Sequence, residues 1–167
     1  MRYPELSYPD ADCVMAHSFG TSLDPGSPNS KIANTMSLLS EGRPMMADRT
    51  VVEARLDLEP HMAHIVDGDV TNFKNGRPEG IGTWGTLVSC LDYMQAHDLE
   101  RPLMVGQAHH IGRILRQAKK LGIDAIKPAW LPANFDQHSE QIWTRSLALW
   151  LPYNAMASLV LKKRGQL

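Results

Sequence analysis

The sequence has no excess of charge of either sign and very few cysteines. Its 167 residues include 17 Lys and Arg against 18 Asp and Glu. Because nucleic-acid-binding domains usually carry a basic face, we expect no general affinity for nucleic acid. The two cysteines, Cys13 and Cys90, share no metal-type spacing and fall in apolar segments. We therefore expect buried free thiols in a protein of the reducing cytoplasm.

Long hydrophobic runs are also missing. Residues 1–6 lack the apolar core of a signal peptide. Residues 146–161 carry no formal charge and precede Lys162, Lys163 and Arg164. This run is shorter than the roughly 20 apolar residues of a membrane-spanning helix, and Pro152 and Asn154 interrupt it. We predict helices that pack into a protein core here, and membrane contact is the weaker alternative.

What is present is an ordinary globular composition with alternating strand and helix patterns. Hydrophobic residues make up 43% and charged residues 21%, and the length suffices for a single domain over residues 1–167. Short apolar runs predict strands at residues 12–16, 44–47, 61–66, 102–106 and 124–128. Helices are predicted at residues 30–42, with Ser30 as the N-cap, at 83–96, at 110–121 and over most of the chain after 128, with a break at Pro152.

Two segments between these elements are less regular. Residues 48–58 fit a helix and a strand equally well by periodicity, and residues 67–82 have the polar, Gly-containing composition of a loop. Short apolar strands that alternate with helices are typical of parallel sheets covered on both faces. We therefore predict an α/β fold, a three-layer Rossmann-like sandwich with a mostly parallel sheet.

The most informative segment joins the predicted strand at 102–106 to the helix at 110–121, where His109, His110 and Arg113 follow one another. Open α/β sheets bind ligands at the carboxyl ends of their strands, and the free N–H groups of a helix N-terminus favour an anion. His110 would then act as general acid or base, and Arg113 would hold a carboxylate or phosphate. The alternative is local hydrogen bonding by the histidines and a solvent-facing arginine.

Two further segments offer hydroxyls or small residues to the same edge. Ser18 and Gly20 follow the first strand, where small residues let backbone N–H groups approach an anion. Thr83 opens the helix before the 102–106 strand, as an N-cap, a ligand contact or both. Residues 16–20 are also similar to a G-x-S-x-G nucleophile elbow that lacks its first Gly, with Ser18 as the nucleophile. A purely structural loop is the simpler interpretation.

His61 and His64, followed by Asp67 and Asp69, have side chains that can ligate a metal. No second cluster stands at a metal-type spacing. We therefore predict a surface loop with scattered polar residues and no metal.

Several of these segments together resemble the bacterial SanA/ElyC/YdcF-type domain of unknown function, over about residues 12–165. Residues 110–113 are similar to its His-Met-Pro-Arg signature, and residues 12–15 with Ser18 and Gly20 to its opening strand and loop. Residues 30–33 are similar to its Ser-x-Arg-Leu pattern, and residues 121–125 are similar to the turn after its signature helix. Gly82 and Thr83 match the start of its Ser-Thr-x-Glu-Asn motif. Gly85 and Thr86 stand where that motif has Glu and Asn, and Gly112 replaces the signature Pro.

The resemblance implies a Rossmann-like domain with a pocket at the carboxyl edge of the sheet and no settled activity. Its YdcF branch is associated with S-adenosylmethionine, but no residue here selects a cofactor. If the family's Glu is catalytic, Gly85 implies binding without that chemistry.

The sequence thus predicts a domain that binds a small anionic or nucleotide-like molecule. The candidate site residues are Ser18, Gly20, Thr83, His109, His110 and Arg113, with His110 as the catalytic candidate. As an enzyme, the protein would be a hydrolase or transferase acting on a phosphorylated or nucleotide-like small molecule. The alternatives are a non-catalytic ligand sensor or interaction module and, third, a serine hydrolase that uses Ser18.

Overall fold

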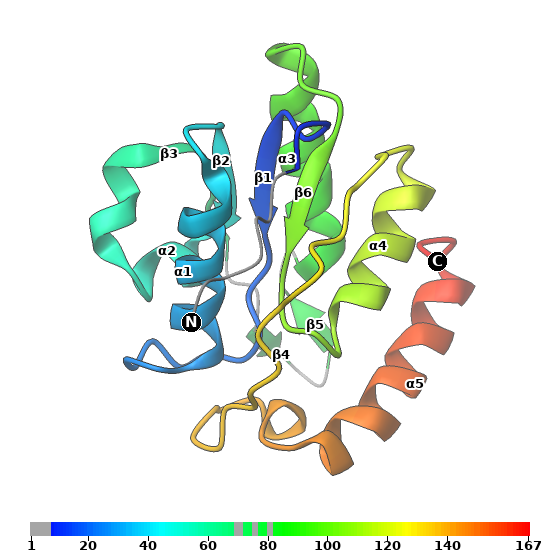
Figure 1. The fold of residues 1–167 in the computed structure, drawn as a ribbon. Coiled ribbons are helices and arrows are strands. Elements are labelled where there is room, and N and C mark those ends of the chain that lie inside the picture. The colour runs from blue at the N-terminus through cyan, green and yellow to red at the C-terminus, as the bar shows by residue number, and fades with distance from the viewer. Residues whose placement is uncertain (1–7, 69–71, 75–76, 80–81) are drawn as a thin grey trace.

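A four-stranded parallel sheet lies at the centre of the computed structural model, which describes residues 8–68, 72–74, 77–79 and 82–167 (Figure 1). The strands stand in the order β3-β2-β1-β6, with these bounds: β1 Cys13–Ala16, β2 Met45–Asp48, β3 Met62–Val66 and β6 Pro102–Val105. Every residue of β1, β2 and β6 is buried. Such burial on both faces is the reason that these strands appear in the sequence as short continuous apolar runs.

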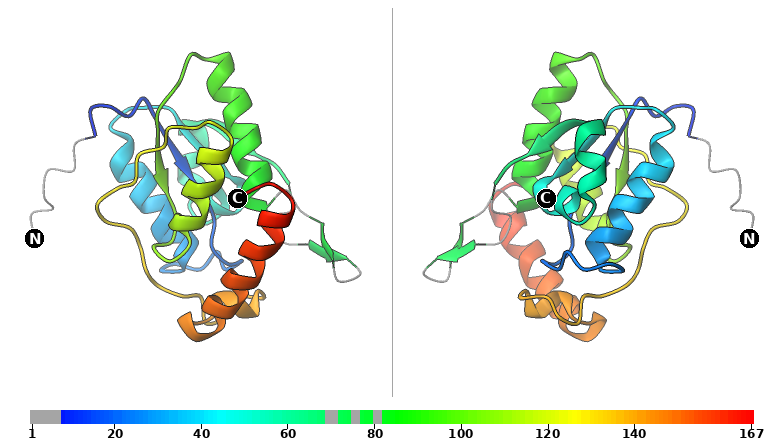
Figure 2. Two further views of the ribbon diagram at one scale, coloured as in Figure 1. Left: turned by 90° about the vertical axis from the view of Figure 1, so that its right-hand side faces the viewer. Right: turned by 90° about the vertical axis from the view of Figure 1, so that its left-hand side faces the viewer.

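Helices cover both faces of the sheet (Figure 2). α1 (Pro28–Ser40) and α2 (Arg49–Glu53) lie together on one face, and α3 (Gly82–Ala96) and α4 (Ile111–Lys120) lie together on the other. The predicted three-layer α/β fold is confirmed. Cys13 and Cys90 are free and buried, as predicted.

Several predicted boundaries shift for local reasons. α1 begins at Pro28 rather than after Ser30, because Ser27 is its N-cap and accepts a hydrogen bond from the Ser30 N–H. α3 already includes Gly82, so Thr83 lies inside its first turn and is not its N-cap. The ambiguous residues 48–58 form α2 and the start of a 3-10 helix, η1 (Leu56–His61).

The loop predicted at residues 67–82 contains a small antiparallel hairpin of β4 (Asn72–Lys74) and β5 (Arg77–Glu79). The strand predicted at 124–128 is reduced to a single bridge between Ile126 and Leu103.

The chain after residue 128 differs most from its prediction. Residues 129–141 have no helix or strand, and a short 3-10 helix, η2 (Ile142–Thr144), precedes α5 (Leu147–Lys163). α5 runs through the exposed Pro152 without a break, although this residue cannot donate a backbone hydrogen bond to the preceding turn. The predicted core packing of this segment is wrong: Trp150 is the one fully buried residue of the helix.

The order of the strands in the sheet indicates where a ligand is expected to bind. The chain builds β1, β2 and β3 outward and then returns through α3 to place β6 on the other side of β1. In open α/β sheets, ligands bind beyond the carboxyl ends of the strands at such a reversal. The loops after β1 and β6 are therefore the place to look for a site.

Candidate ligand-binding site

Three of the predicted site residues meet at this reversal. Arg113 Nη2 donates to His110 Nε2 over 2.9 Å, and Thr83 Oγ1 lies 3.4 Å from the same nitrogen. The spacing of three residues puts His110 and Arg113 on one side of the first turn of α4. Both are buried, whereas Thr83 at the start of α3 is half-buried.

α5 completes the surroundings of Arg113. Asn154 Oδ1 accepts from Arg113 Nη1 at 3.2 Å, and the guanidinium carbon lies 5.0 Å from the Trp150 ring centroid and 5.8 Å from that of Tyr153. These distances are typical of cation–π contacts. Trp150 also donates from Nε1 to the His109 carbonyl, which ties α5 to the start of α4.

Arg113 has no carboxylate partner among the residues that the structure describes. It is 8% exposed, and burial lowers its pKa. A buried cation without a counter-ion is costly. This side chain is therefore suited to receive an anion.

His110 is a neutral imidazole at ordinary pH. Its pKa lies well below the usual value because of burial first and then of the nearby Arg113 and His17. Since a guanidinium only donates, His110 Nε2 must accept and the proton is assigned to Nδ1. Within the described residues, Nδ1 has no hydrogen-bond partner, so it offers a free donor.

His17, directly after β1, adds a second buried imidazole. It is 2% exposed, burial lowers its pKa to about 3, and neither ring nitrogen has a partner in the described part of the chain. The sequence offers only a weak signal for it, a polar residue at the carboxyl end of a buried strand next to the more typical nucleophile candidate Ser18.

Backbone N–H groups at the start of α4 are mostly engaged, because those of Ile111 and Arg113 donate to the Gln107 and His110 carbonyls. Gln107 Oε1 accepts from the His109 N–H at 2.7 Å and from the His110 N–H at 3.2 Å. Its amide donates to the carbonyls of Ala133 and Asn134. The Gln107 side chain thus holds the turn that leads into α4, whose N-cap residue His110 makes no side-chain cap, and we expect side chains to supply most donors for an anion at this edge.

Ser18 lies at the same edge but is engaged by Asp48, the last residue of β2. Its N–H donates to Asp48 Oδ2 over 2.8 Å, its hydroxyl also bonds this carboxylate, and Oδ1 caps α2 by accepting from the Val51 N–H. Burial raises the pKa of Asp48. Sequence analysis missed Asp48 because residues 48–58 had no clear periodicity.

Gly20 and His109 lie outside this cluster. A Cβ on Gly20 would lie 3.1 Å from Asp136 Oδ2 and Thr144 Oγ1, so the residue is a close-packing point against the 136–144 segment. The neighbouring N–H groups of Thr21 and Ser22 also bond that segment, through Ser139 and Asp136. His109 is exposed, and its ring stacks on Phe135.

His61 and His64, whose side chains can ligate a metal, do not meet. His64 Nε2 lies 2.9 Å from Ser89 Oγ and its ring stacks on Tyr93, whereas His61 ends η1 at another surface. Asp69 lies outside the described residues. Over the described ranges, no group of three or more His, Cys, Asp or Glu side chains is placed to hold a metal ion.

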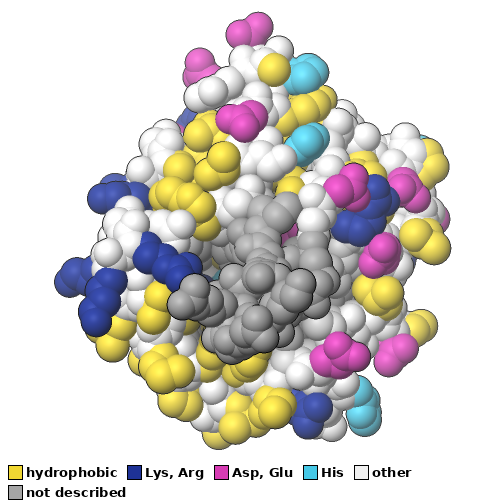
Figure 3. All heavy atoms as spheres, turned by 180° about the vertical axis from the view of Figure 1, so that it is seen from behind, with side chains coloured by type: hydrophobic (Ala, Val, Ile, Leu, Met, Phe, Trp, Pro, Cys, Tyr) yellow, Lys and Arg dark blue, Asp and Glu magenta, His cyan; other side chains and the backbone are white. Residues whose placement is uncertain are grey.

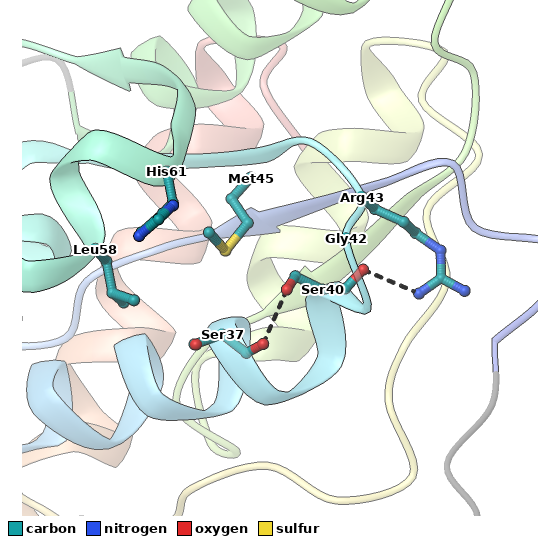
Figure 4. A pocket seen from close by; sticks show the side chains of 7 residues that line it. All are labelled: Ser37, Ser40, Gly42, Arg43, Met45, Leu58 and His61. Carbon is teal, nitrogen blue, oxygen red and sulfur yellow. Dashed lines mark hydrogen bonds between the residues drawn. The ribbon is translucent and has the colours of Figure 1, made fainter.

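Two open clefts lie elsewhere. One, of about 320 Å³, is at the amino end of β2 and is lined by Ser37, Ser40, Gly42, Arg43, Met45, Leu58 and His61 (Figure 4). The Arg43 side chain turns away from this cleft, to the carbonyls of Leu39 and Ser40. The other, of about 310 Å³, is lined by residues of the 21–24 loop with His138 and Glu140. The cluster around Arg113 contributes to neither cleft.

Comparisons with protein-family models, with curated proteins and with solved structures gave no match for this chain. The likeness to the SanA/ElyC/YdcF-type domain stays a prediction. In the described part of the chain, none of the helices combines the length and the apolar character that crossing a membrane requires.

Proposed function

We propose that this domain binds a small anionic molecule at the carboxyl edge of its sheet, with the anionic group against Arg113. The observation that carries the proposal is the buried guanidinium without a carboxylate partner among the described residues. His110 Nδ1 and the His17 ring add hydrogen-bonding atoms that have no partner there. Phosphate esters and nucleotide-like molecules are the ligand class that such a donor-rich site suits.

A ligand would reach the Arg113 guanidinium between the half-buried residues that surround it. Thr83 stands on the α3 side, and Tyr153 and Asn154 on the α5 side. A ligand oxygen that reaches Arg113 between them replaces water with charge-assisted hydrogen bonds, which are about twice as strong as neutral ones.

Binding without chemistry is the interpretation that we favour over hydrolysis. The Nε2 lone pair of His110 already accepts from Arg113, and the lowered pKa makes the ring a poor base. A catalytic role for His110 therefore requires a ligand to draw Arg113 away from it. The protein then serves as a ligand sensor, or as a hydrolase or transferase if that rearrangement occurs.

The test is a thermal-shift series with inorganic phosphate, sulfate, sugar phosphates, nucleotides and S-adenosylmethionine. A ligand at about a hundredfold excess over its Kd adds roughly 2.7 kcal/mol, which raises the Tm of a domain of this size by about 5–10 °C. Arg113→Met removes the charge but keeps an apolar stem, so it abolishes the shift while the Tm without ligand stays equal or rises.

Arg116→Met is the matched control, because Arg116 is exposed on the next turn of α4. It should leave the shift and the Tm unchanged. A shift that persists in Arg113→Met, together with a Tm several degrees lower, would show that Arg113 is structural and end the proposal.

A further inference from the structure

The solvent-facing side of α5 is apolar over most of the helix. Six of its large hydrophobic side chains are 40–65% exposed: Leu147, Leu149, Leu151, Met156, Leu159 and Val160. Soluble monomers rarely expose contiguous apolar patches of this kind, and such patches mark contact surfaces. The sequence run that predicted core packing is thus left in contact with solvent.

The exposed residues form one broad face that ends in positive charge. Residues 148, 152, 155 and 159 (Ala, Pro, Ala and Leu) are all exposed and follow one another at spacings of three and four, which places them along the middle of this face. The other five large hydrophobic side chains flank this middle stripe, two on one side and three on the other. Lys162 and Lys163 continue this side by one more turn and are exposed. The face is therefore apolar for most of its length and cationic at its carboxyl end.

The charge around this face has a single sign. From Gln141 to Leu167 the sequence has no Asp or Glu, and Arg145 and residues 162–164 supply cations at both ends of α5. Exposed Arg116, Lys119 and Lys120 of the neighbouring α4 extend this basic rim. Figure 3 shows hydrophobic side chains at its lower left, over α5, next to a group of Lys and Arg side chains. These seven basic residues are a large share of the 17 Lys and Arg of a chain whose net charge is −1.

We propose that α5 docks the protein onto a bilayer surface that carries anionic lipid headgroups. An interfacial helix buries an apolar face at the headgroup boundary while nearby Lys and Arg side chains contact anionic lipids. Pairing of α5 with a second copy fits less well. Parallel helices would put the two 162–164 clusters together, antiparallel helices would put each cluster beside Arg145, and no carboxylate of residues 141–167 could neutralise either.

Vesicle co-sedimentation tests this proposal. We expect the protein to pellet with phosphatidylcholine vesicles that contain phosphatidylserine, to bind pure phosphatidylcholine far more weakly, and to be released as salt rises. Lys162→Glu/Lys163→Glu should raise the apparent Kd at least about 30-fold, since each cation near an anionic surface contributes about fivefold. A Leu151→Ser/Met156→Ser/Leu159→Ser variant should abolish pelleting.

Matched controls lie on α1, across the sheet. Leu38→Ser replaces a side chain that is 58% exposed, and Lys31→Glu reverses an exposed charge. Neither should alter vesicle binding. Absence of binding to phosphatidylserine vesicles, or equal losses in the α1 controls, would overturn the proposal. A concentration-dependent dimer in analytical ultracentrifugation that the triple α5 variant disrupts, without vesicle binding, would assign the face to self-association.

Discussion

Arg113 donates from Nη2 to Nε2 of His110 over 2.9 Å, within the first turn of a helix that α5 covers. This contact fixes the hydrogen-bonding role of the imidazole, because a guanidinium has no acceptor. The pair presents a cation and a free N–H donor, and both are buried. A pair of donors is complementary to an anion, whereas a general base needs the lone pair that Arg113 already occupies.

We expect the free energy of unfolding to fall as the pH drops below about 6.5. Burial lowers the pKa of His17 to about 3, and that of His110 lies well below its ordinary value. Between these values and the unfolded pKa near 6.5, the unfolded chain binds protons that the native protein does not. Each group then contributes about 1.4 kcal/mol per pH unit, and the measurement is urea unfolding from pH 7.5 to 5.

His17→Leu separates this effect from other titrations. The raised pKa of Asp48 acts with the opposite sign, because the native carboxyl keeps a proton that the unfolded chain loses above about 4. That contribution is common to both proteins, so the difference in slope isolates His17. A slope that is the same in variant and wild type would show that His17 is protonated, or exposed to water, in the native state.

Gly20→Ala should destabilise the protein more than Gly26→Ala. Both glycines have positive φ, +82° and +86°, so both substitutions introduce backbone strain of about 1–2 kcal/mol. The Cβ of an alanine at position 20 would also press against oxygen atoms of the 136–144 segment. The Cβ of an alanine in place of Gly26 would have no atom within 4 Å. We expect an extra cost of about 1–3 kcal/mol in chemical denaturation. Equal costs would contradict the close packing at Gly20.

Asp48→Ala should cost about 2–4 kcal/mol. It removes the N-cap of α2, and it leaves the Ser18 N–H without an acceptor at a partly buried position. Asp57→Ala, which breaks an exposed ion pair with Arg55, is the control and should cost less than about 1 kcal/mol. If the two variants unfold at the same denaturant concentration, the contact between the β1 and β2 loops does not stabilise the fold.

Ser18 should not react with a fluorophosphonate probe. Its hydroxyl bonds the Asp48 carboxylate, and neither ring nitrogen of the adjacent His17 makes a hydrogen bond to a described residue. A serine nucleophile needs a base within hydrogen-bond reach. Labelling is read by mass spectrometry of the Ser18 peptide, and a labelled peptide that disappears in Ser18→Ala would restore the serine hydrolase hypothesis.

The sequence predicted those parts of the fold and site that depend on local pattern. β1, β2 and β6 were recognisable because burial on both faces requires continuous apolar runs, and His110 and Arg113 share a helix side by spacing alone. The α5 residues beside Arg113 were not predictable, since a contact across about 40 residues depends on tertiary packing. The apolar run of α5 predicted packing into the core, and its exposure was likewise not predictable because it depends on tertiary packing.

Two buried glutamines near the start of α4 and within it should respond differently to substitution. Gln107 is fully buried, and both ends of its amide are bonded, to the His109 and His110 N–H groups and to the 133–134 carbonyls. Gln117, also buried in α4, has an Oε1 without a partner among the described residues. Gln107→Leu orphans several backbone groups and should cost about 2–4 kcal/mol, while Gln117→Leu removes an unsatisfied atom and should be neutral or stabilising. Urea unfolding of the two variants distinguishes them. Equal costs would mean that the His109 and His110 N–H groups find water in place of the Gln107 side chain, and these donors before α4 would then be open to an anion.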